Sequence, residues 1–117
     1  MIHYRGYRDD DRSLVTRIEV NTVGATLEGS LRTLSPVPSQ KLWNHSPDGF
    51  SWGYSGSGPA QLALALLYDV TEDKEIAVRL HQDFKREYVT AWGDTWEITD
   101  FQIQSWVDRQ NIAASTP

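Results

Sequence analysis

Cysteine is absent from the sequence, which excludes a disulfide framework, a thiolate nucleophile and a cysteine-ligated metal. Long apolar runs are absent too. The longest, Leu62 to Tyr68, is far shorter than the roughly 20 residues of a membrane-spanning helix. The N-terminal stretch MIHYRGYRDDDR is polar and lacks the apolar core of a signal peptide. We therefore expect a soluble cytoplasmic protein with no membrane partner.

An excess of basic residues is also missing. The net charge is −5, from 11 lysines and arginines against 16 acidic residues. Residues 1–58 carry six charges of each sign, whereas residues 59–117 carry five basic and ten acidic residues. Proteins that bind nucleic acid normally present a basic surface, so nucleic acid is not expected as the main partner. The acidic half is either an ordinary solvated surface or a face that docks onto a basic patch of another protein.

What is present suits one compact domain. The chain has 117 residues, 39% of them hydrophobic, which predicts a single domain over residues 1–112 and a disordered tail at residues 113–117. Residues 2–7 and 14–23 alternate loosely between apolar and polar positions, which predicts two strands. The acidic stretch Asp9–Asp11 would join them as a solvated hairpin turn.

The next segment is predicted to be irregular. Ala25–Gly29 suits a short strand, and Ser35–Ser39 suits a loop because its two prolines disfavour regular structure. Ser46–Gly49 has the composition of a tight turn. A further short strand is expected at Phe50–Tyr54.

The second half is predicted to form three helices. The first begins near Pro59, with Ser57 or Gly58 as its cap, and is apolar all round except for Gln61, which predicts a buried helix. Thr71 would cap a second, amphipathic helix over residues 72–91, ended by Gly93.

After an extended Trp96–Ile98, the capping box Thr99–Gln102 opens a helix to about Arg109. The predicted fold is α+β. A small antiparallel sheet from the N-terminal half packs on three helices from the C-terminal half, and the central helix is buried.

The loop before the central helix, Ser55, Gly56, Ser57 and Gly58, admits two interpretations. Free amides at a helix start attract anions, and glycines let a phosphate approach closely. Alternatively, the small residues only allow a sharp corner. The sequence matches neither a phosphate-binding motif nor a nucleophile elbow. His45 and Asp48 flank the preceding turn, where they either form an acid–base pair with a loop serine or satisfy the turn's own backbone.

No metal site or cofactor is expected, because His3, His45 and His81 lie in unrelated contexts without ligand spacing. Five tryptophans are many for this length. Trp52, Trp96 and Trp106 are predicted to lie in the core. The core is the favoured position for Trp43 and Trp92 too, although either could anchor a partner from a loop end.

The stretch HSPDGFSWGYSGSGPAQLALALL, from His45 to Leu67, resembles a shared block of a family of small uncharacterised proteins from bacteria, phages and mobile elements. The likeness continues through residues 82–85 and 96–106. Ser51 and Ser55 stand where that family often has an acidic residue and a glycine. The resemblance implies a prokaryotic or viral setting and assigns no activity.

Two functions remain open. The leading hypothesis is a non-enzymatic interaction module of a phage or mobile element, such as an inhibitor of a host defence complex, in a prokaryotic or infected host cell. It would contact a protein partner through its acidic helical half (Glu72, Asp73 and Glu75), through the serine–glycine loop or through Trp43. The alternative is a small ligand-binding or hydrolytic domain that holds an anion on the amides of residues 56–60, with His45 and Asp48 nearby. No residue is assigned a catalytic role.

Overall fold

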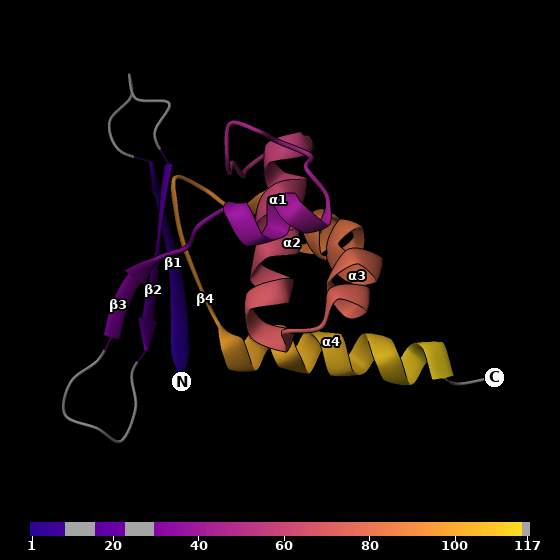
Figure 1. The fold of residues 1–117 in the computed structure, drawn as a ribbon. Coiled ribbons are helices and arrows are strands. Elements are labelled where there is room, and N and C mark those ends of the chain that lie inside the picture. The colour runs from indigo at the N-terminus through magenta and orange to yellow at the C-terminus, as the bar shows by residue number, and fades with distance from the viewer. Residues whose placement is uncertain (9–15, 23–29, 116–117) are drawn as a thin grey trace.

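The computed structural model describes residues 1–8, 16–22 and 30–115, and its architecture is α+β, as predicted (Figure 1). Strands β1 (Ile2–Arg8) and β2 (Thr16–Thr22) form the predicted antiparallel pair. Strand β3 (Ser30–Thr33) adds to β2, and β4 (Thr95–Thr99) adds to the other side of β1. The sheet order is β3-β2-β1-β4. The predicted turn at residues 9–11 and the predicted strand at residues 25–29 lie outside the described residues.

Helices cover one face of this sheet. Figure 1 shows α2 (Ser57–Thr71) next to the sheet and α3 (Lys74–Glu87) on the side of α2 that faces away from the sheet. Helix α4 (Asp100–Ser115) runs across the ends of α2 and α3. The shorter elements are α1 (Val37–Leu42) and the 3₁₀ helix η1 (Val89–Ala91). Because α2 packs against α1, α3, α4 and η1, it is the centre of the fold.

The predicted burial of α2 is confirmed. Every residue from Gly58 to Leu67 is buried, and Leu62, Leu64 and Leu66 are each 0% exposed. Burying a leucine side chain contributes about 1.5–3 kcal/mol relative to leaving it in water, so an all-apolar helix strongly favours a central position. Strands β1, β2 and β4 turn their own apolar residues toward it, and these are Tyr4, Ile18, Val20, Trp96 and Ile98.

The start of α2 explains one glycine of the serine–glycine loop. Gly56 is the N-cap, and Gly58 lies buried in the first turn. A Cβ atom added at Gly58 would lie 2.8 Å from the Cβ of Ser51 and 3.1 Å from its backbone nitrogen. Real Cβ atoms do not approach that closely, so the position requires glycine for packing.

Two local predictions were wrong, the loop at residues 35–39 and the strand at residues 50–54. Residues 35–39 are not all loop, because α1 begins at Val37 and carries Pro38 in its first turn. Proline is tolerated there since the first amides of a helix have no intrahelical partner. Residues 50–54 form no strand. Instead Trp52 is 0% exposed and its indole nitrogen donates to the Gly93 carbonyl at 2.7 Å. Gly53, with φ of 85°, turns the chain at this point.

The junction after α2 also differs from the prediction. Helix α2 continues through Thr71, and Glu72 then adopts the left-handed conformation with φ of 54°. Asp73, not Thr71, caps α3, because its carboxylate accepts a hydrogen bond from the Ile76 amide at 3.1 Å. Helix α3 ends at Glu87 and gives way to η1 before Gly93 is reached. Helix α4 is longer than predicted and extends to Ser115.

Candidate functional site

A surface groove lies where β1 begins, α2 ends and α4 begins. It encloses about 540 Å³. The antiparallel pairing of β1 with β4 explains this meeting point, because His3 lies opposite Thr99 at the end of β4 and α4 starts at the next residue. The residues that line the groove are Met1, Ile2, Asp69, Val70, Glu72, Asp100, Phe101 and Gln104.

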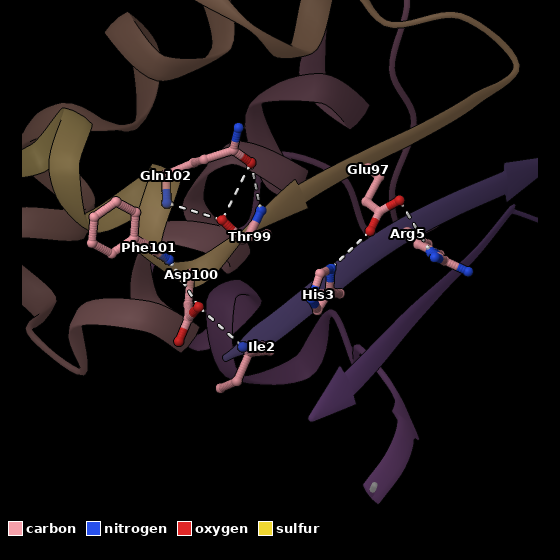
Figure 2. A network of polar contacts seen from close by, with 8 residues as sticks. All are labelled: Ile2, His3, Arg5, Glu97, Thr99, Asp100, Phe101 and Gln102. Atoms are coloured by element: carbon pink, nitrogen blue, oxygen red, sulfur yellow. Dashed lines mark hydrogen bonds and ion pairs between the residues drawn. The ribbon is translucent and has the colours of Figure 1, made fainter. Parts of the chain in front are cut away.

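The start of α4 is held by local hydrogen bonds, shown in Figure 2. Gln102 N donates to Thr99 Oγ1 at 3.1 Å, and Thr99 N donates to Gln102 Oε1 at 2.9 Å, which is the predicted capping box. Asp100 Oδ1 accepts from Ile2 N at 3.0 Å and from Phe101 N at 2.8 Å. Asp100 therefore ties the first strand to the last helix. Phe101, fixed at this corner, is 67% exposed.

Asp69 forms the opposite wall and has two partners. Its carboxylate accepts from the Tyr4 hydroxyl at 2.6 Å and from Arg32 Nη2 at 2.8 and 3.0 Å. Tyr4 is 0% exposed. Burial raises the pKa of the Tyr4 hydroxyl well above its ordinary value, and the hydrogen bond to Asp69 raises it further. This phenol stays protonated and donates, so the Asp69 carboxylate is fixed in place.

The groove is acidic and partly apolar. Among the described residues that line it are three carboxylates, Asp69, Glu72 and Asp100, and no lysine or arginine. Met1, 58% exposed, adds apolar surface beside Phe101. The last turn of α2 also carries no basic residue, although the partial negative charge at a helix C-terminus favours cations there. Arg32 offsets the charge of Asp69, so the negative charge next to the exposed aromatic ring comes from Glu72, Asp100 and the C-terminal end of α2.

The three acidic residues predicted as partner contacts have separate surroundings. All three are exposed. Glu72 lines the groove. Asp73 is engaged as the N-cap of α3. Glu75 lines a different recess with Leu42, Lys74, Val78 and Arg79.

A second polar cluster lies near the start of α2, where sequence analysis expected only isolated histidines. His45 Nε2 is 2.9 Å from His81 Nε2 of α3. The Trp43 indole, 50% exposed, stacks on the His45 ring with centroids 4.5 Å apart. His81 itself is 1% exposed. Its position four residues after the buried Ala77 places it on the apolar stripe of α3, and that spacing was the available signal.

Gln61, the polar exception in α2, positions this cluster. Its Oε1 accepts from the backbone nitrogens of His45 at 2.7 Å and Ser46 at 3.0 Å, and its Nε2 donates to Ser39 Oγ at 2.9 Å. Gln61 is 0% exposed, so one buried amide fastens α1 and the following segment to α2.

Burial lowers the pKa of both histidines. For His45, the neighbouring His81 and the ammonium of Lys85 lower the pKa further. For His81, hydrogen bonds to the backbone at Val78 and Ala77 oppose the effect of burial, and Lys85 adds to it. Both rings are therefore favoured in their neutral form.

The remaining predicted site residues are not brought together by their described contacts. His45 is engaged with Trp43 and His81. Asp48 is exposed in the turn predicted at residues 46–49, which is present, with Gly49 at φ of 111°. Ser55 and Ser57 are exposed at the start of α2. Anion binding at these amides stays a prediction, as does an acid–base role for His45 and Asp48.

The tryptophan predictions divide clearly. Trp52, Trp96 and Trp106 are buried, as predicted, and Trp92 is partly buried and stacks on Trp96 with centroids 4.0 Å apart. Trp43 differs from the favoured core assignment, because half of its surface is exposed. Its position beside His45, after the last turn of α1, explains this exposure.

Within the described ranges, no three His, Cys, Asp or Glu side chains are grouped so that they could hold a metal ion. Likewise, none of the helices in that part of the chain is both long enough and apolar enough to cross a membrane.

Comparison with known proteins gives one match. No curated protein and no solved structure matches the chain. A family model does match, and it spans residues 4–109, which include the His45–His81 cluster, the whole of α2 and α3, and the groove residues other than Met1 and Ile2. The chain therefore belongs to the family described as a family of unknown function, DUF6166.

Proposed function

We propose that this chain is a non-enzymatic interaction module that binds a basic, partly apolar segment of another protein in the groove between β1, α2 and α4. The observation that carries the proposal is Phe101, 67% exposed beside the carboxylates of Asp69, Glu72 and Asp100. An aromatic side chain in such a position contributes about 1.5–3 kcal/mol when a partner covers it.

The charges of the groove support a basic partner. The negative charge offered to a partner comes from Glu72 and Asp100, because the charge of Asp69 is already paired with Arg32. Asp100 is held in place by hydrogen bonds before any partner arrives, so binding need not order it again. Complementary charge speeds association and selects the partner, while a buried aromatic anchor supplies most of the affinity. A segment with a lysine or arginine next to an apolar side chain satisfies both requirements.

The proposal includes a phage or mobile-element setting, in which such a module would inhibit a host defence complex by protein–protein contact. This finer part is supported by the sequence resemblance alone. This part of the proposal invokes no catalytic residue.

The test compares capture by matched variants. The wild-type chain, Phe101→Ser and Glu72→Lys would be immobilised and exposed to host lysate at low and at high salt. Leu31→Ser is the control, because Leu31 is 65% exposed on β3 and lies outside the groove. We expect a captured protein that the wild type and Leu31→Ser retain and that Phe101→Ser loses at least tenfold. Glu72→Lys should weaken capture mainly at low salt, where charges are least screened.

Equal capture by Phe101→Ser and the wild type would contradict the proposal, as would a partner lost equally with Leu31→Ser. Circular dichroism of each variant shows whether it is folded. All three substituted side chains are exposed, so their replacement should leave the core intact.

A further inference from the structure

The histidine pair between the α1–α2 segment and α3 carries a second, independent inference. A single hydrogen bond joins the two rings, at 2.9 Å between His45 Nε2 and His81 Nε2. The backbone next to His45 is fixed separately, because Gln61 accepts from the amides of His45 and Ser46. The side chain of His45 can therefore move without the backbone that bears it.

The environment of His81 decides which nitrogen carries a proton. Its Nδ1 lies 2.6 Å from the carbonyl oxygen of Val78, and a carbonyl only accepts, so Nδ1 must carry hydrogen and donate. In a neutral imidazole the other nitrogen is then an acceptor. His81 Nε2 consequently accepts from the Nε2–H of His45.

This arrangement makes the contact sensitive to acid. The only position where His81 can take up a proton is Nε2, and the His45 donor already occupies it. One added proton, with Nδ1 of His45 protonated, leaves a single hydrogen between the two Nε2 atoms, whereas protonation of both rings sets two N–H groups against each other. A state in which the His45 ring has left α3 therefore binds one more proton than the closed state, and acid favours it by linkage.

We propose that the His45–His81 hydrogen bond is a pH-sensitive contact that opens in acid. Closed at neutral pH, it holds the His45 ring and the Trp43 indole stacked on it against α3. In acid, uptake of a proton by His81 releases both side chains, while Gln61 keeps the backbone of residues 45 and 46 attached to α2.

The other groups around the pair agree with this direction. From α3, the ammonium of Lys85 acts on both rings and disfavours a positive charge there. From α2 and α1 the neighbouring polar groups are neutral, namely Gln61 and Ser39. Trp43 packs edge-on to His81, with centroids 5.5 Å apart, so its release would uncover a ring that is now 1% exposed.

The first experiment reads the tautomers of the unmodified protein by long-range ¹H–¹⁵N NMR of the imidazoles. At pH 7.5 we expect His81 to carry its proton on Nδ1 and His45 on Nε2. A proton on His81 Nε2 at that pH would overturn the proposal without any substitution.

The second experiment follows the Trp43 indole N–H from pH 7.5 to 5.0 by heteronuclear NOE. The wild type should lose rigidity at Trp43, while the amides of His45 and Ser46 keep their values. His81→Gln is the matched variant, because its side-chain oxygen accepts near the position of Nε2 and does not titrate, so its Trp43 signal should stay rigid. An unchanged wild-type signal, or the same loss of rigidity at Trp43 in His81→Gln, would overturn the proposal.

Discussion

The two ends of α2 use polar groups in opposite ways. At its start, Gln61 and the His45–His81 pair form a neutral cluster around a fully buried amide. At its end, Asp69 and Glu72 join Asp100 in a charged groove with an exposed aromatic ring. A polar group that loses its hydrogen-bond partner destabilises the fold strongly when it is buried and only slightly when water can replace the partner. The start of α2 should therefore govern folding, and its end should govern recognition.

Removing the buried side-chain amide of Gln61 should cause the largest loss of stability. In Gln61→Leu the Ser46 amide loses its acceptor, the His45 amide keeps only its 3.1 Å bond to the Trp43 carbonyl, and the Ser39 hydroxyl loses its donor but keeps its bond to the Pro36 carbonyl. With about 1–3 kcal/mol for each buried group left unsatisfied, and partial access to water for the segment, we expect a loss of about 3 kcal/mol in the free energy of unfolding by urea. Gln104→Leu, in the groove at the other end, should lose less than about 0.5 kcal/mol. Equal losses would abolish the distinction between the two ends.

Acid should weaken the start of α2 by a smaller amount. The folded-state pKa values of His45 and His81 lie below the ordinary value of about 6.5, so the unfolded chain binds more protons. The stability from these rings is fully present above pH 6.5 and is lost as the pH falls through that value toward the folded-state pKa values. Urea unfolding at pH 7.5 and 5.5 should show this loss, reduced in His45→Gln/His81→Gln. A wild-type stability that rises on acidification would contradict the assignment.

The smallest loss of stability is expected from a substitution on the solvent-exposed face of the sheet. Glu97 accepts from His3 at 2.8 Å and pairs with Arg5 at 3.4 Å (Figure 2), and these contacts lower the pKa of Glu97. Exposed ion pairs contribute little, so Glu97→Gln should change the free energy of unfolding at pH 7 by less than about 0.5 kcal/mol. A loss of unfolding free energy as large as that of Gln61→Leu would mean that the contribution of a polar contact does not depend on its exposure to solvent. High salt should further reduce the difference in unfolding free energy between Glu97→Gln and the wild type.

The sequence predicts those features whose cause is local. The burial of α2 follows from its uninterrupted apolar residues, and the capping box at Thr99 lies within four consecutive positions. Asp73 was missed as a cap because Thr71, two residues earlier, suits the same role. In α1, two prolines predicted a loop, although the first turn of a helix accommodates them.

The two polar clusters were harder to predict because each depends on contacts between distant residues. Gln61 was recognised as the polar exception in α2, but its partners lie in the segment that precedes the helix, and no periodicity connects them. His45 and His81 are 36 positions apart. The groove joins residues near both ends of the chain through the β1–β4 pairing. Composition indicated an acidic half, and only the topology placed Phe101 of α4 beside Asp69 and Glu72 at the end of α2.

The left-handed backbone of Glu72 has a consequence for how this sequence can vary. That conformation suits glycine, and any other residue there gives up about 1 kcal/mol. Glycine would thus be the thermodynamically easier choice at the end of α2, yet the chain has a carboxylate at the mouth of the groove. Glu72→Gly would therefore relieve backbone strain at the end of α2 and at the same time remove one carboxylate from the groove.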